Sequence, residues 1–438
     1  MSTRMGYALL SGVLGLGLLV TAVLLLARPG RPEPAAPAAP APADGWVGTW
    51  SAAPSAAEPG TGDGYPRQSI RNVVHTSIGG SRARVRFSNL YGNRPLTLTH
   101  VTLALPASGG APAAAPGTLR RLTFDGRTEV TVPPGRAVTS DPARLTVPAD
   151  ADVLVTTYAP APSGPVTHHS TAQQTSYLAH GNRSGDLSGA AYNRRTPYWR
   201  YVTGVDVWNP RAQGTLVAVG DSITDGTRST PGTNHRWPDF LADRLRTEHG
   251  APRYGVLNQG IAGNRLLTDG RRPAPAAHPD NAALLTRLER DVLSRTGART
   301  VVVMIGINDL LRSPRQRDAG AVVAGLREVT DAARDRGLRV VGGTLLPFGG
   351  HRGHTPQTES LRQEINRSIR AGRLFDAVID FDRALSDPAH PERLRPAYDS
   401  GDHLHPGDAG YRAMAEAVDL DQLTARAPAA TASSSSKG

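Results

Sequence analysis

Leu216-Val-Ala-Val-Gly-Asp-Ser-Ile-Thr-Asp-Gly226 joins a short apolar run to a polar turn that is bounded by glycines. A run of this kind is typical of a strand that is buried on both faces of a parallel sheet. Further apolar runs follow at Val256–Leu257, Val301–Ile305, Val340–Val341 and Ala377–Ile379. Amphipathic segments predict helices at Trp237–Thr247, Ala282–Leu293, Ala319–Arg336 and Glu359–Ala371, with a last helix after Pro406. This alternation predicts an α/β fold with a doubly wound parallel sheet.

Upstream of this stretch, from Trp46 to about Thr203, apolar residues recur with a period of two. The apolar residues of Ala83–Phe87 alternate with arginines, as expected for a strand with one solvated face. Asp125-Gly126 has the composition of a hairpin turn. Further strands are predicted at Leu96–Leu105, Arg144–Val147 and Asp152–Tyr158. Many short strands with Gly and Pro between them predict an antiparallel β-sandwich that is similar to a jelly roll.

These patterns divide the chain into five predicted segments. A basic start and the apolar run Tyr7–Ala27 indicate an exported protein, either extracellular or anchored to the outer face of the cytoplasmic membrane. The segments are a signal peptide or signal anchor at 1–28, a Pro/Ala-rich linker at 29–45, the β-sandwich domain at 46–205, an α/β domain at 206–422 and a disordered tail at 423–438.

The composition excludes several classes of function. The formal net charge is +11, and Lys437 is the single lysine. The arginines are spread along the chain, without the basic stripe of a nucleic-acid binder, so no nucleic-acid partner is expected. The chain has no cysteine, which excludes disulfides, thiolate metal sites and cysteine nucleophiles. A chain of this length can bury its own cores, and we expect a monomer.

Three polar motifs follow predicted strands, at the edge where doubly wound sheets bind ligands. Ser222 lies on a strand-to-helix turn, where its hydroxyl is either a nucleophile or the cap of the next helix. Gly263, in Asn258-Gln-Gly-Ile-Ala-Gly-Asn264, either offers its amide to an oxyanion or belongs to an ordinary turn. Asn308, in Gly306-Ile-Asn-Asp309, either aims its amide at the same oxygen or closes the strand with an Asx turn.

A fourth motif, Asp402-His-Leu-His-Pro406, precedes the last predicted helix. Asp402 stands three residues before His405 and can reach its Nδ1, which would leave Nε2 free to accept a proton. Alternatively, Asp402 is a cap and His405 is a surface residue. Because the four motifs supply a nucleophile, oxyanion donors and an acid–base pair in order, their coincidence favours a catalytic site.

The four motifs resemble the blocks that define the SGNH (GDSL-type) hydrolases. Those enzymes are esterases, lipases and carbohydrate O-deacetylases on a flavodoxin-like fold. By this resemblance Ser222 is the nucleophile, His405 is its base and Asp402 orients the base. The residues from 46 to 205 are similar to the β-rich extension of a bacterial, notably actinobacterial, branch of the family, on the softer motifs Gln68-Ser-Ile-Arg71 and Arg86–Gly92.

The resemblance implies a serine ester hydrolase that cleaves carboxylic esters through an acyl-enzyme on Ser222. The backbone amides of Ser222 and Gly263 and the side chain of Asn308 would form the oxyanion hole, with no metal ion and no cofactor. The expected substrates are small-molecule, lipid or glycan esters. The alternatives are a carbohydrate O-acetyl esterase, an acyltransferase with a sugar acceptor, and a glycan-binding or adhesion protein with a vestigial hydrolase domain.

Overall fold

The computed structural model describes residues 45–271 and 278–424, which belong to one compact unit of the chain. The predicted signal segment, the linker up to residue 44 and the tail from residue 425 onwards lie outside these residues. Within the two described ranges, no helix combines the length and the apolar character that a membrane span requires.

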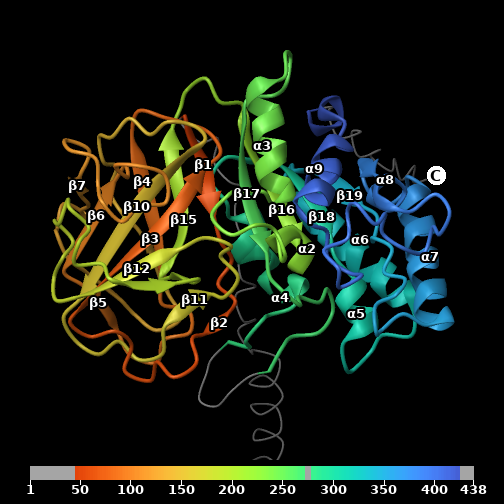
Figure 1. Ribbon diagram of the computed structural model, residues 1–438, viewed down its shortest axis with the longest axis horizontal. Coiled ribbons are helices and arrows are strands. Elements are labelled where there is room, and N and C mark those ends of the chain that lie inside the picture. Colours follow the sequence, from red (N-terminus) through yellow and green to blue (C-terminus); the bar gives the residue numbers. More distant parts are fainter. Residues whose placement is uncertain (1–44, 272–277, 425–438) are drawn as a thin grey trace, which may run out of the picture. The chain divides into compact units, whose positions relative to one another are not determined.

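The first half of the described chain forms antiparallel sheets (Figure 1). The four-stranded sheet runs in the order β1 (Trp46–Ser51), β15 (Val202–Trp208), β4 (Ala83–Ser88) and β9 (Ala137–Thr139). The six-stranded sheet runs in the order β13 (Arg194–Thr196), β12 (Ser176–His180), β3 (Gln68–Thr76), β10 (Ala151–Ala159), β6 (His100–Ala104) and β7 (Arg120–Arg121). Smaller sheets join β14 (Trp199–Arg200), β11 (Thr167–His169) and β2 (Ala56–Ala57), and β5 (Leu96–Leu98) with β8 (Val130–Val132).

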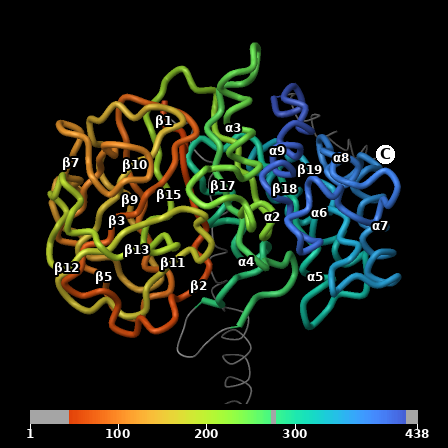
Figure 2. The backbone as a smooth tube through the Cα atoms, in the orientation of Figure 1, coloured from red at the N-terminus to blue at the C-terminus, as the bar shows by residue number. Residues whose placement is uncertain are grey.

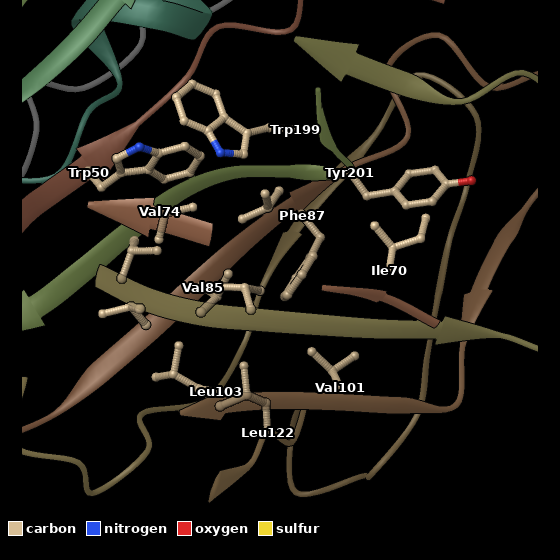
Figure 3. Close-up of a cluster of buried hydrophobic side chains, with 14 of the residues drawn as sticks. Trp50, Ile70, Val74, Val85, Phe87, Val101, Leu103, Leu122, Trp199 and Tyr201 are labelled. Carbon is tan, nitrogen blue, oxygen red and sulfur yellow. The ribbon is translucent and has the colours of Figure 1, made fainter. Parts of the chain in front are cut away.

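Both larger antiparallel sheets contribute to one hydrophobic cluster, part of which Figure 3 shows. On β4 the apolar side chains are fully buried and the two arginines between them are partly exposed, which confirms the predicted alternation. Asp125 and Gly126 have φ values of 50° and 76°, and Phe124 and Arg127 exchange backbone hydrogen bonds across them, as a hairpin turn requires. The predicted strand at 144–147 is wrong, because this segment makes only one isolated bridge, from Val147 to Gly80.

The second half of the described chain contains a parallel sheet, and the colours of Figure 2 place this half beside the antiparallel half. The sheet has the order β17 (Tyr254–Gly260), β16 (Gly214–Gly220), β18 (Ala298–Met304), β19 (Arg339–Gly343) and β20 (Ala377–Ile379). Numbered from β16, this order is 2-1-3-4-5, which is that of a flavodoxin-like sheet. The predicted fold class is therefore confirmed for this half.

Helices cover both faces of the parallel sheet, because successive side chains of each strand point to opposite faces. Val217 and Val219 of β16 pack on one side with α4 (Leu284–Leu288), α6 (Ala319–Asp335) and α7 (Pro356–Arg370). Leu216 and Ala218 pack on the other with α3 (Trp237–Thr247), α8 (Phe381–Leu385) and α9 (Asp408–Glu416). The predicted helix at Ala282–Leu293 starts later, at Leu284, and ends as the π-helix η1 (Glu289–Leu293).

The antiparallel and parallel regions meet through hydrogen bonds that backbone amides donate, as well as through side chains. Gly48 donates its amide to Thr215 Oγ1 over 3.0 Å, and Val256 donates its amide to Ser77 Oγ over 2.8 Å. A Cβ on Gly48 would lie 2.7 Å from a methyl carbon of Leu257, so β1 approaches β17 closely. The β-rich region thus lies against β17, whose carboxyl end leads into the turn that contains Gly263.

Candidate active site

Ser222 is the first residue of a short helix at the carboxyl end of β16, which lies between β17 and β18 in the parallel sheet. The helix α2 (Ser222–Asp225) follows Gly220 directly, with Asp221 as its N-cap. Asp221 accepts a hydrogen bond from the Ile223 amide over 3.0 Å, so the alternative in which Ser222 caps this helix is wrong. A Cβ on Gly220 would lie 2.4 Å from Met304 O, and this close approach requires glycine.

A chain of hydrogen bonds links Ser222 to the fourth motif. His405 Nε2 lies 2.8 Å from Ser222 Oγ, and His405 Nδ1 lies 2.9 Å from Asp402 Oδ2. The other oxygen of Asp402 accepts the backbone amides of Leu404 and His405, over 3.1 and 2.9 Å. Since the carboxylate can only accept, it holds the Nδ1 proton and leaves Nε2 as the acceptor for the serine proton.

The environment keeps Asp402 ionised. Burial acts to raise the pKa of Asp402, but the hydrogen bonds from the backbone and ring of His405 outweigh it and hold that pKa well below its usual range. Arg228 adds a partly exposed ion pair, with Nε 3.1 Å from Asp402 Oδ2. His403, the other histidine of this motif, does not contact Asp402, because its Nδ1 lies 2.6 Å from Asp399 Oδ2.

Gly263 and Asn308 both lie close to the side chain of Arg312. Arg312 donates its Nε–H to Asn308 Oδ1 over 3.1 Å, and a Cβ on Gly263 would lie 2.4 Å from Arg312 Nη2. Gly263 has a φ of 74°, which favours glycine. Asn308 belongs to α5 (Ile307–Leu311), and within the described ranges its buried Nδ2 has no hydrogen-bond partner. With Oδ1 occupied by Arg312, the amide has a free donor for an incoming oxygen.

Two further residues, Asp309 and Arg312, organise these donors, and their roles were not predicted from the sequence. Asp309 accepts the amides of Leu266 and Leu267 over 2.8 and 3.0 Å, which ties the start of α5 to the loop after β17. Arg312 stands four residues after Asn308, so the spacing of one helical turn was the available signal. The rings of His351 and His354 both lie edge-on to Phe348. In the part of the chain that is described, no group of three potential metal ligands occurs.

Asp221 gives the stability of the protein a testable pH dependence. Burial, with a smaller contribution from Asp309, raises the pKa of Asp221 to about 7. The folded state therefore binds the Asp221 proton more tightly than the unfolded chain does. This proton stabilises the folded state at low pH, and that stabilisation is lost as the pH rises from about 4 to about 7. Asp221→Asn keeps an acceptor for the Ile223 amide but cannot ionise. We expect its Tm to exceed that of the parent by several degrees at pH 8 and to match it at pH 4.

The matched control for this measurement is Asp318→Asn. Asp318 is the N-cap of α6 and accepts the Gly320 amide over 2.8 Å, but it is exposed. Its replacement makes the same chemical change at an exposed helix N-cap, so it controls for the loss of the carboxylate itself. A difference between Asp221→Asn and the parent that does not grow with pH would contradict the buried-proton explanation.

A family profile and several solved structures match parts of the chain. Residues 218–413 match the profile of the GDSL-like Lipase/Acylhydrolase family. An acetylxylan esterase from Geobacillus stearothermophilus is 21% identical, with a TM-score of 0.37 and coverage of 49% of this chain and 95% of its own. A GDSL-like lipase from Bacteroides thetaiotaomicron is 18% identical, with a TM-score of 0.35 and coverage of 48% and 88%. No curated protein matches the chain.

The profile match begins inside β16, before Ser222, and ends inside α9, after His405. It therefore spans the parallel sheet and all four motifs. Residues 218–413 form a domain of the GDSL-like lipase/acylhydrolase family.

Proposed function

We propose that the protein is a serine ester hydrolase that cleaves carboxylic esters through an acyl-enzyme on Ser222. The hydrogen-bonded series Ser222–His405–Asp402, with contacts of 2.8 and 2.9 Å, carries this proposal. A serine hydroxyl is a weak nucleophile unless a neighbouring base accepts its proton in the transition state. The series supplies that base and the carboxylate that orients it.

The reaction has two steps that use the same residues. Ser222 Oγ attacks the ester carbonyl while its proton moves to His405 Nε2, and the carbonyl π electrons move to the oxygen. As this tetrahedral intermediate collapses, the bond to the alcohol breaks and His405 returns the proton to the leaving alkoxide. Water then attacks the acyl-enzyme by the same route, which releases the acid and restores the Ser222 hydroxyl.

The free amide of Asn308 is proposed to stabilise the oxyanion in both steps, together with the backbone amides of Ser222 and Gly263. Asn308→Ala removes a donor aimed at charge that develops only in the transition state, so we expect kcat to fall about 10²- to 10³-fold with little change in KM. Steady-state kinetics on p-nitrophenyl acetate measure this. Asn209→Ala, which also removes a side-chain donor but before β16, at the opposite end of that strand, should leave kcat unchanged. Equal kinetics of the two variants would remove Asn308 from the mechanism.

The full chain, assayed on p-nitrophenyl esters from acetate to palmitate, tests the function itself. We expect turnover, and we expect stoichiometric inactivation by a fluorophosphonate with the adduct on Ser222 in peptide mass spectrometry. A maximum at acetate would favour the carbohydrate O-acetyl esterase alternative, and a maximum at long chains a lipase. If no ester is hydrolysed and the fluorophosphonate leaves Ser222 unmodified, the proposal is wrong.

A further inference from the structure

A histidine of the β-rich region contacts the helix that carries Ser222. His169 is the last residue of β11, and its Nε2 lies 2.9 Å from Asp225 Oδ1 at the end of α2. The two side chains are only 4% and 3% exposed. His169 Nδ1 lies 2.8 Å from the carbonyl oxygen of Ala53. The ring is therefore held at both nitrogens, on one side by the β-rich region and on the other by the catalytic helix.

The contacts of His169 define its protonation. A backbone carbonyl and an ionised carboxylate can each only accept hydrogen bonds. Both ring nitrogens of His169 therefore carry a proton. Burial and the nearby Arg236 act to lower the pKa of His169, but the charge and hydrogen bond of Asp225 outweigh them and raise it. His169 and Asp225 thus form a buried ion pair with charge-assisted hydrogen bonds, which are the stronger kind.

Asp225 uses its second oxygen to hold the turn that contains Gly263. Its Oδ2 accepts the backbone amide of Ala262 over 2.8 Å, and Ala262 directly precedes Gly263. The turn also lies close to α2, because a Cβ on Gly260 would be 2.2 Å from the Asp225 nitrogen. A single carboxylate therefore connects the helix that begins with Ser222 to the turn that presents the proposed oxyanion donor.

The β-rich region provides a rigid support for His169. Its ring lies 5.5 Å from the ring of Trp199, and Trp199 packs edge to face on Trp50 within the hydrophobic cluster (Figure 3). The indole of Trp199 donates to Val73 O over 2.7 Å. We propose that His169 is a positioning residue of the active site, which orients Asp225 so that the Ala262–Gly263 turn stays at the correct distance from Ser222.

This inference rests on the proposed function and extends it to the β-rich region. That region would complete the oxyanion hole without touching the substrate. Small displacements of a catalytic group can cost about 10²-fold in rate, so a residue outside the reacting atoms can have a large effect.

The kinetic test compares two neighbouring histidines in the full chain. His168 lies beside His169 on β11, is equally buried and makes one backbone contact of 2.9 Å with Ala56, so His168→Phe is a matched control. We expect His169→Phe to lower kcat about 10- to 100-fold with KM nearly unchanged, and His168→Phe to keep the parental kcat. His169→Gln, whose amide can donate to Asp225, should recover most of the lost rate. Parental kcat in His169→Phe, or an equal loss in His168→Phe, would overturn the proposal.

Two further measurements separate positioning from general destabilisation. In an Asp225→Ala background, His169→Phe should cost no additional rate, because the contact that it removes is already absent. Hydrogen exchange in the peptide from Asn258 to Leu266 should become faster in His169→Phe but not in His168→Phe. Unchanged exchange would overturn the proposal even if no ester were hydrolysed. A parent without esterase activity but with the expected exchange would refute only the proposed function.

Discussion

Replacing Ser222 with alanine is expected to lower kcat about 10⁵- to 10⁶-fold on p-nitrophenyl acetate while the protein stays folded. The hydroxyl is the atom that forms the acyl-enzyme, and His405 has no other hydroxyl in hydrogen-bond contact with its Nε2 among the described residues. The residual rate comes from water attack in a site that still binds and polarises the ester. Because the substrate contacts are retained, KM should change little.

A neighbouring serine supplies the control for this measurement. Ser229 is buried in the turn after α2, and its hydroxyl donates to Gly226 O over 2.8 Å without contacting His405. Ser229→Ala also removes a serine hydroxyl, from the turn that follows α2, and should reduce kcat less than about twofold, since it removes one hydrogen bond that takes no part in the chemistry. Fluorophosphonate labelling should disappear only in Ser222→Ala. If kcat of Ser222→Ala lies within tenfold of the parental kcat, the reaction does not pass through an acyl-enzyme on Ser222.

In the second half of the chain, an element was predicted with the correct bounds where its local sequence pattern had a single physical explanation. The helix α3 has the predicted bounds because proline is tolerated in its first turn and its apolar residues recur with helical spacing. The helix predicted at Ala282–Leu293 is present with a later start and a π-helical end, but the burial of its Arg287 and Asp291 was not predicted. Arg287 donates to Gly220 O and Asn264 Oδ1, and such distant contacts leave no periodic signal.

Some residues of the candidate site could be predicted from the sequence, and others could not. Ser222, Gly263 and Asn308 follow strands of one parallel sheet, so topology alone brings them to a common edge. Asp402 and His405 are three residues apart, and their contact is local. His169 lies on β11 and Asp225 lies on α2, 56 residues apart in the sequence. The strand β11 is too short to show a periodic pattern. Contacts made by the packing of one region on another cannot be read from spacing within either.

Replacing Asp402 with asparagine is expected to lower kcat about 10⁴-fold, the second largest effect in this site. The new side chain would keep an oxygen for the backbone amides of Leu404 and His405, so the loop should retain its conformation. Its amide would donate to His405 Nδ1, which forces the ring proton onto Nε2. That tautomer cannot accept the Ser222 proton. Steady-state kinetics and Tm, measured on the same preparation, test both halves of the argument.

Asp399→Asn provides the control, because Asp399 contacts the other histidine of the same loop. Its Oδ2 lies 2.6 Å from His403 Nδ1, and its Oδ1 accepts the amides of Gly401 and His403. The same chemical change should alter loop stability but leave the Ser222–His405 contact intact, so kcat should stay within about tenfold of the parent. If Asp402→Asn retains most of its activity, His405 is held in its reactive tautomer by something other than this carboxylate. If both variants lose activity and Tm together, the loop conformation, not the tautomer of His405, sets the rate.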